Sequence, residues 1–222
     1  DIFDFKTDKI NRPEKPLPNR EINIKTVINL LFLLFLINFT FVLNLNNLAQ
    51  SIVYFIVLPI IITYTPIFKS IPLVGNFLIG GILGCVFLFS EAALTNQVKI
   101  MWIPALLATH LTVLRELLKD IEDHQGDCET NIITFPVCFG IQNSIYLFLF
   151  LTISLLLWAG LLPFYMPLNS IYLPTFWFIF SPWIFFVLYL LYWEKSAKYK
   201  KISNYLKIAS IFGLIVIITF RF

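Results

Sequence analysis

Two groups of aspartates with the same spacing are the feature of this sequence best suited to chemistry. The first lies in DIFDFKTD and the second in DIEDHQGD, more than a hundred residues later. The i, i+3, i+7 spacing predicts three carboxylates on one face of a helix, because a helical turn takes 3.6 residues. The candidate metal ligands are Asp1, Asp4, Asp8, Asp120, Asp123 and Asp127.

Six carboxylates brought to one place repel one another unless cations lie between them. Oxygen ligands suit Mg²⁺, which keeps part of its water shell and binds through carboxylates together with substrate phosphates. The two groups therefore predict a Mg²⁺ cofactor and a diphosphate substrate. One such group alone is more typical of a solvated helix end, whereas two with equal spacing favour a function.

The elements that must position these groups are apolar and long. Of the 222 residues, 59% are hydrophobic and only 13% are charged, about half the charged share of a soluble domain. Seven continuous apolar segments come close to the roughly 20 residues that span a bilayer, and they lack the alternation of a membrane barrel. We predict one domain over residues 1–222, an all-α polytopic transmembrane helix bundle. Its spans are expected near 24–43, 50–66, 72–93, 99–118, 142–164, 171–193 and 203–220.

The charges predict how the spans are oriented. If the spans alternate in direction, one side receives 14 of the 16 basic residues, and only Lys99 and Arg221 fall opposite. That side is predicted to be cytoplasmic, because cytoplasmic loops are enriched in Lys and Arg. Twelve of the 13 acidic residues lie there too, with Glu91 the exception. We therefore expect an integral protein of the cell membrane whose active site faces the cytoplasm, and the net charge gives no indication of a nucleic-acid partner.

Basic side chains near the aspartates suit a diphosphate, which needs cationic donors in addition to metal. Lys69 lies in the cytoplasmic loop between the two groups, Arg115 and Lys119 precede the second group, and Arg12 and Lys15 follow the first. The alternative interpretation of these residues is anchoring at the membrane surface, which requires no chemistry.

Tyr64 lies five residues before Lys69. If it faces the same cavity, its π face could stabilise an allylic cation formed from a prenyl diphosphate. Most other aromatic residues are expected to face lipid or to pack between helices.

The motifs together resemble those of the UbiA superfamily of intramembrane prenyltransferases. DIFDFKTDKINRPEKPLP is similar to the family's first motif, N-D-x-x-D-x-x-x-D before a Pro-rich basic stretch, and RELLKDIEDHQGDCETNIITFPVCFG resembles its second aspartate-rich loop. YTPIFKSIPLVGN resembles the Tyr/Lys loop and the Gly-Asn after it, here Gly75 and Asn76. With the residues above, this predicts a catalytic set of Lys69, Tyr64 and Lys119. The predicted substrate-binding set is Arg12, Lys15, Asn76 and Arg115.

The resemblance also implies a fold of nine helices, with the first motif after helix two and the second after helix six. The seven spans predicted here correspond to helices three to nine. The sequence has no counterpart of the first two helices or of the Asn before Asp1. It is therefore expected to be truncated at its N-terminus.

Within the superfamily, NRPEKPLP and RELLKDIEDHQGD most resemble the (di)geranylgeranylglyceryl phosphate synthases. That resemblance implies transfer of geranylgeranyl from its diphosphate to the hydroxyl of geranylgeranylglyceryl phosphate, in ether-lipid synthesis. The expected partners are a prenyl diphosphate, a lipid or aromatic acceptor and membrane lipids.

Alternatives to this acceptor and this class of protein remain open at this point. Chlorophyll synthases have a similar first motif, and aromatic-acceptor members of quinone pathways come next. A cation transporter would be a different class, but transporters place their ion sites near the bilayer midplane, whereas both aspartate groups here lie at cytoplasmic helix ends. A non-catalytic remnant is the last alternative.

Overall fold

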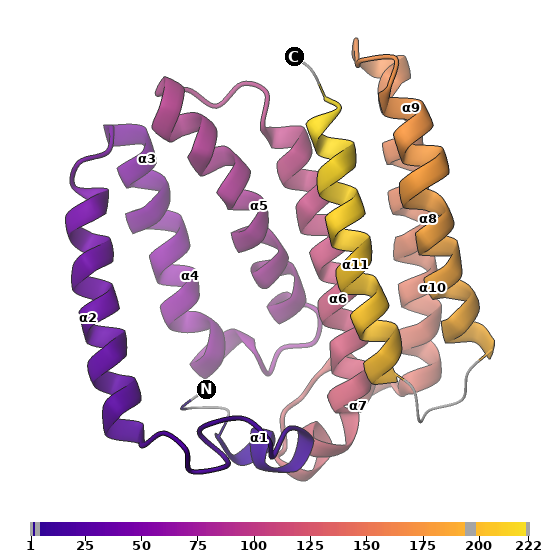
Figure 1. The fold of residues 1–222 in the computed structure, drawn as a ribbon. Coiled ribbons are helices and arrows are strands. Elements are labelled where there is room, and N and C mark those ends of the chain that lie inside the picture. The colour runs from indigo at the N-terminus through magenta and orange to yellow at the C-terminus, as the bar shows by residue number, and fades with distance from the viewer. Residues whose placement is uncertain (1, 3–4, 194–198, 221–222) are drawn as a thin grey trace.

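The computed structural model describes residues 2, 5–193 and 199–220, and within these ranges its regular elements are helices. Two short helices, α1 (Phe5–Asn11) and α7 (Phe135–Phe139), lie at one end of the molecule, at the bottom of Figure 1. Long helices run from that end to the other. They are α2 (Ile24–Val42), the composite helix Asn47–Phe68, α5 (Val74–Thr95), α6 (Trp102–Glu129), α8 (Ile141–Tyr165), the composite helix Tyr172–Trp193 and α11 (Tyr199–Ile218).

These long helices match the seven predicted spans in order and approximate bounds, so the predicted all-α transmembrane bundle is confirmed. Six of them are long and apolar enough to cross a membrane. Helix α6 differs because its second half carries the acidic group that begins at Asp120. Its apolar first half matches the predicted span at 99–118, and the acidic half extends that helix toward α1 and α7.

Two of the long helices contain wider, π-helical turns. The first consists of α3 (Asn47–Ser51), η1 (Ile52–Val57), α4 (Leu58–Thr63) and η2 (Tyr64–Phe68). The second consists of α9 (Tyr172–Thr175), η3 (Phe176–Phe180) and α10 (Ser181–Trp193). In η2, Pro66 has no N–H to donate, and the Lys69 N–H donates to the Tyr64 carbonyl at 2.8 Å, across a five-residue turn. Such turns are frequent at functional sites, and this one carries two of the predicted catalytic residues.

Helices α5 and α6 approach each other closely through two glycines. A Cβ added at Gly80 would lie 2.8 Å from the Thr109 carbonyl oxygen, and one added at Gly84 would lie 2.7 Å from that of Ala105. Pairs of small residues four apart allow membrane helices to pack with their backbones in contact. The glycines thus fix how α5 lies against the helix that carries the second aspartate group.

The buried core lies around α6, α8, α10 and α11. On α6, Leu114, Leu117 and Leu118 have no exposed surface, and Ile121 is 2% exposed. Of the residues of α2, by contrast, only Val42 at its end is buried, as expected of a helix surrounded by lipid. Helix α6 is therefore the most firmly packed of the elements that carry site residues.

The turn between α5 and α6 is held by Glu91, at the opposite end from α1. Its carboxylate accepts backbone hydrogen bonds from Lys99 at 3.0 Å, Ile100 at 3.1 Å and Met101 at 3.0 Å. The acidic residue that stood apart in the sequence thus caps a turn.

Candidate active site

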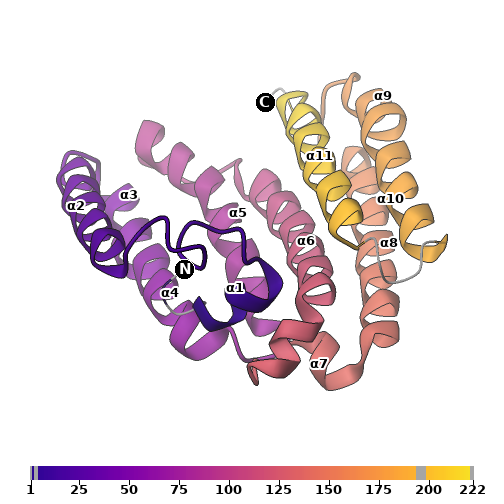
Figure 2. The ribbon, with the colours of Figure 1, turned by 60° about the horizontal axis from the view of Figure 1, so that its bottom comes forward.

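The two aspartate-bearing segments meet at one end of the bundle. Figure 2 shows α1 lying across the ends of α5 and α6, and α1 contacts α6 directly. Asp1 and Asp4 lie outside the described residues, so the first group is represented by Asp8. A small cavity of about 60 Å³ opens between these segments, and we call it the acidic pocket. Its polar lining consists of Thr7, Asp8, Asn11, Arg12, Lys15, Tyr64, Lys69, Asn76, Glu116, Lys119, Asp120, Asp123, Asp127 and Thr134.

Polar contacts hold α1 against α6. The hydroxyls of Thr7 and Thr130 lie 3.1 Å apart, and the Asn11 amide donates to the Asp123 carbonyl at 3.3 Å. Gly126 lies beneath Asn11, because a Cβ at this position would collide with the Asn11 side chain. The absence of a side chain at Gly126 therefore allows α1 to approach the acidic half of α6.

Ion pairs from Arg12 join the same two segments across the pocket, and another ion pair lies within the N-terminal segment. The Arg12 guanidinium donates to both carboxylate oxygens of Asp123, at 3.1 and 3.0 Å, and lies 3.9 Å from Glu122. Lys15 donates to Asp8 at 2.7 Å. The two basic residues that follow the first aspartate group therefore neutralise one carboxylate from each group.

The opposite wall comes from η2 and the start of α5. The Asn76 amide donates to the Asp120 carboxylate at 2.7 Å. Tyr64 in η2 and Lys69 directly after it line the pocket. Gly75 packs against this turn, since a Cβ there would lie 3.3 Å from the Phe68 carbonyl oxygen. The Tyr/Lys turn and the Gly-Asn pair thus form one unit facing the second aspartate group.

Burial makes the carboxylates of the second group difficult to ionise in the absence of added cations. Burial raises the pKa of Asp120 to about 7, opposed by the Asn76 hydrogen bond and assisted by repulsion from Asp127. The pKa of Asp127 rises to about 6 through burial and then repulsion from Asp123. Burial also raises the pKa of Asp123, although Arg12 opposes the rise. A bound cation would favour ionisation of these carboxylates, because its charge would offset both their burial and the repulsion between them.

The oxygen donors fit a divalent metal in their chemistry. Oxygen-only donors are those that Mg²⁺ prefers. In the part of the chain that the structure describes, however, no three acidic, His or Cys side chains already surround one point as a metal site. Three of the described aspartates are instead paired with Arg12, Lys15 and Asn76, so metal binding would compete with some of these contacts.

The acidic pocket gathers most of the predicted site residues, but not all of them. Arg115 does not line the pocket. The next residue, Glu116, does, and it lies about 100° further around α6. Thr7, Asn11, Glu116 and Thr134 were not predicted. Glu116 could have been found from its i, i+4 spacing to Asp120, which places the two on neighbouring parts of one helix face.

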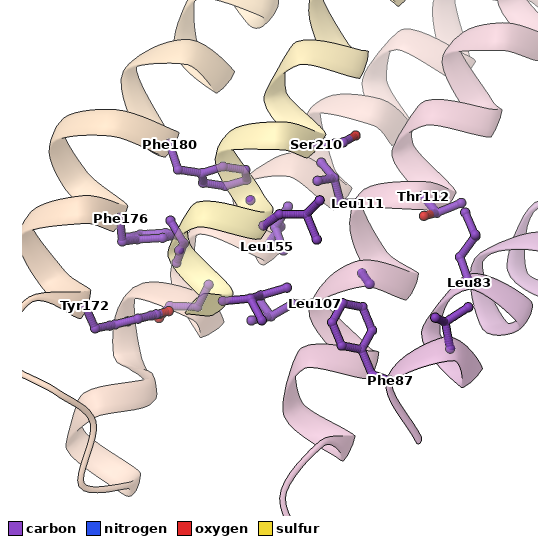
Figure 3. Close-up of a pocket in the computed structure, with 17 residues that line it drawn as sticks. Leu83, Phe87, Leu107, Leu111, Thr112, Leu155, Tyr172, Phe176, Phe180 and Ser210 are labelled. Atoms are coloured by element: carbon purple, nitrogen blue, oxygen red, sulfur yellow. The ribbon is translucent and has the colours of Figure 1, made fainter. Parts of the chain in front are cut away.

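An apolar cavity of about 310 Å³ lies deeper in the bundle, between α5, α6, α8, α11 and the second composite helix. Figure 3 shows Tyr172, Phe176 and Phe180 on one side of it and Leu83 and Phe87 on the other. From α6 it is lined by Leu107, Ala108, Leu111 and Thr112.

Comparison of this sequence with known proteins identifies the family to which it is related. The model of the UbiA prenyltransferase family matches residues 1–211. A digeranylgeranylglyceryl phosphate synthase of Methanosarcina mazei is 36% identical over 148 residues, which cover 66% of this chain and 51% of that protein. The corresponding synthase of Saccharolobus solfataricus is 31% identical over 217 residues, covering 97% of this chain and 76% of that protein.

A solved structure gives the same result for the fold. It comes from work on digeranylgeranylglyceryl phosphate synthase in membranes, and its chain superposes with a TM-score of 0.68 at 28% identity. The match covers 99% of this chain and 78% of that one. The sequence resemblance is therefore confirmed. With its six apolar helices, the chain is an integral membrane protein and belongs to the UbiA family of prenyltransferase enzymes.

Proposed function

We propose that this protein transfers a geranylgeranyl group from its diphosphate to the hydroxyl of geranylgeranylglyceryl phosphate, with Mg²⁺ as cofactor. The observation that carries the proposal is the acidic pocket, where carboxylates and cations from both aspartate-bearing segments face one another. The choice of acceptor is supported by the two related synthases named above.

Charge in the pocket explains why a diphosphate would bind together with metal. Four basic side chains line it, Arg12, Lys15, Lys69 and Lys119; Arg12 is already paired with Asp123 and Lys15 with Asp8. A diphosphate adds negative charge that these cations alone cannot balance, so divalent cations are needed between it and the carboxylates.

We assign the metal to Asp8, Asp120, Asp123 and Asp127, together with Asp1 and Asp4 outside the described residues. Bound there, a divalent cation supplies neutralisation of charge on the leaving diphosphate. Lys69 and Lys119 would donate hydrogen bonds to the diphosphate, and Arg12 and Lys15 would be available to it if metal neutralised their aspartates. Asn76 orients Asp120, and Tyr64 presents its ring to the allylic cation.

The apolar cavity has the size of a small ligand pocket and a lining suited to the isoprenoid tail. A tail held there excludes water from the allylic carbon, which favours transfer to the acceptor over hydrolysis. We place the acidic pocket on the cytoplasmic side, because the basic residues of the sequence gather at that end.

The test is product analysis by mass spectrometry with full-length protein in detergent. Given geranylgeranyl diphosphate and Mg²⁺, we expect a product with geranylgeranylglyceryl phosphate and none with chlorophyllide or aromatic acids. Asp123→Asn should reduce transfer at least about 100-fold, because charge stabilisation of this kind contributes that much to rate. Product from an aromatic acceptor alone would refute the acceptor assignment, and full activity of Asp123→Asn would refute the metal assignment.

A further inference from the structure

One face of α6 connects the apolar cavity to the acidic pocket. Ala108 and Thr112 line the cavity, while Glu116 and Asp120 line the pocket. These positions are four residues apart, so each lies about 6 Å further along the helix and within about 120° of the others around it. Glu116 is therefore the first charged side chain met along this face on leaving the apolar cavity.

Glu116 lies where the prenyl group would pass from the diphosphate to the acceptor under the proposed function. With the isoprenoid tail in the cavity and the diphosphate among the cations of the pocket, the carbon–oxygen bond between them lies at the junction of the two. An acceptor oxygen must reach the same carbon. Glu116 stands one turn from Thr112 and one turn from Asp120, at this junction.

The Glu116 carboxylate is also the one in the pocket that the metal assignment does not use. Lys15, Asn76, Arg12 and Thr134 each bind one of the four described aspartates. Glu116 lies outside both aspartate groups. Its Oε2 accepts a hydrogen bond from Lys119 at 3.4 Å, and its side chain is only 12% exposed. The lysine orients the carboxylate and leaves Oε1 able to accept a second hydrogen bond.

We propose that Glu116 is the general base that binds the acceptor hydroxyl and takes its proton, an inference that rests on prenyl transfer to a hydroxyl as the proposed function. The bond between the allylic carbon and the diphosphate oxygen breaks, and its electron pair leaves with the diphosphate. The acceptor oxygen bonds to that carbon as its proton passes to Glu116. The Glu116 acid then returns the proton to water.

Other side chains at the site are less suited to this role. Lys69 and Lys119 are cationic donors, and His124 contacts Cys128 at 3.2 Å and does not line the pocket. A general base must lie within hydrogen-bond reach of the reacting group, and Glu116 is the described carboxylate nearest the apolar cavity along α6.

The experiment uses full-length protein, geranylgeranyl diphosphate and geranylgeranylglyceryl phosphate, with Glu116→Gln and Glu116→Asp as variants. Loss of a general base lowers rate by about 100-fold or more, so we expect that fall in kcat for Glu116→Gln with KM for the diphosphate little changed. Glu116→Asp should recover part of the rate. Glu129→Gln, an exposed carboxylate on the same helix, is the control and should match the unmodified protein.

A second acceptor separates a base from a structural role. In a thiol analogue of the acceptor, the nucleophile is far more acidic than a hydroxyl and is partly ionised near pH 9 without a base, since the pKa of a cysteine thiol is about 8.5. Glu116→Gln should lose much less rate with this analogue than with the hydroxyl compound. Equal losses with both acceptors, or full activity of Glu116→Gln with the hydroxyl, would overturn the inference. Absence of product from the unmodified protein with either acceptor would instead refute the proposed function.

Discussion

Helix α1 and the acidic half of α6 come from sequence motifs of the same spacing, yet they are held in place by different means. Helix α6 has 28 residues, and its buried leucines pack into the core just before the aspartates begin. Helix α1 has seven residues and is fixed by hydrogen bonds and ion pairs to α6. The half of the site on α6 is therefore preformed, whereas the half on α1 depends on a few surface contacts.

Gly126→Val should have the largest effect, because it should move α1 away from α6. The new side chain would occupy the place of Asn11 and displace α1 from α6. A misplacement of about 1 Å at a reacting centre can cost about 100-fold in rate, so we expect a loss of that order in transfer assays. Thermal unfolding should change little, because α1 lies outside the core. Gly81→Val, where no atom lies within 4 Å of an added Cβ, is the matched control. Equal activity of the two variants would contradict the role of Gly126.

Arg12→Ala should have the next largest effect, because Arg12 joins both halves. We expect KM for the prenyl diphosphate to rise about tenfold, which corresponds to about 1.4 kcal/mol of binding. Arg12→Lys should recover only part of this, because the ammonium keeps the charge but lacks the other guanidinium N–H donors. Steady-state kinetics with varied diphosphate would measure the change. An unaltered KM in Arg12→Ala would place the residue outside the binding site.

Asp120→Asn should stabilise the metal-free protein, and increasingly so as pH rises. The pKa of Asp120 is raised to about 7 in the fold, so between about pH 4 and 7 the unfolded chain loses its proton first. Stability therefore falls as pH rises through this window, and asparagine removes that fall.

Thermal unfolding in EDTA at pH 5 and pH 8 would test this prediction. We expect the larger gain in Tm at pH 8, with Glu129→Gln as the control. Added Mg²⁺ should then stabilise the unmodified protein more than Asp120→Asn. A gain that is the same at both pH values would show that burial of charge is not the cause.

Thr7→Val should have the smallest effect. It removes the hydroxyl contact with Thr130, and one such hydrogen bond contributes about 1 kcal/mol. Since other contacts still hold α1, we expect transfer to fall about two- to fivefold. Thr40→Val removes a hydroxyl on the exposed helix α2 and serves as the comparison. A loss as large as that of Gly126→Val would mean that α1 is held mainly through Thr7.

Much of this arrangement could be predicted from the sequence. Continuous apolar segments predicted the long helices. The distribution of charged residues between spans of alternating direction predicted that both aspartate groups lie at one end. The helix period gave the face shared by Asp120, Asp123 and Asp127. The finer detail was harder to predict: Arg115 was chosen as a substrate-binding residue from its helical spacing to the second aspartate group, whereas Glu116, the next residue, is the one that lines the acidic pocket.

Other contacts depend on geometry that no local pattern encodes. The bond from Asn11 to the Asp123 carbonyl requires α1 to cross α6 at Gly126, and nothing in either segment alone specifies that crossing. The ion pair between Arg12 and Asp123 likewise joins residues more than a hundred positions apart. Such contacts follow from the tertiary fold.

The Glu91 cap has a consequence for chemistry at the other surface of the membrane. By closing the turn between α5 and α6, it sets how far one helix is shifted along the other. A shift of one helical turn would move Asn76 about 5.4 Å from its partner Asp120, well beyond hydrogen-bonding distance. Three backbone hydrogen bonds on the far surface thus help to keep an amide and a carboxylate aligned across the thickness of the bilayer.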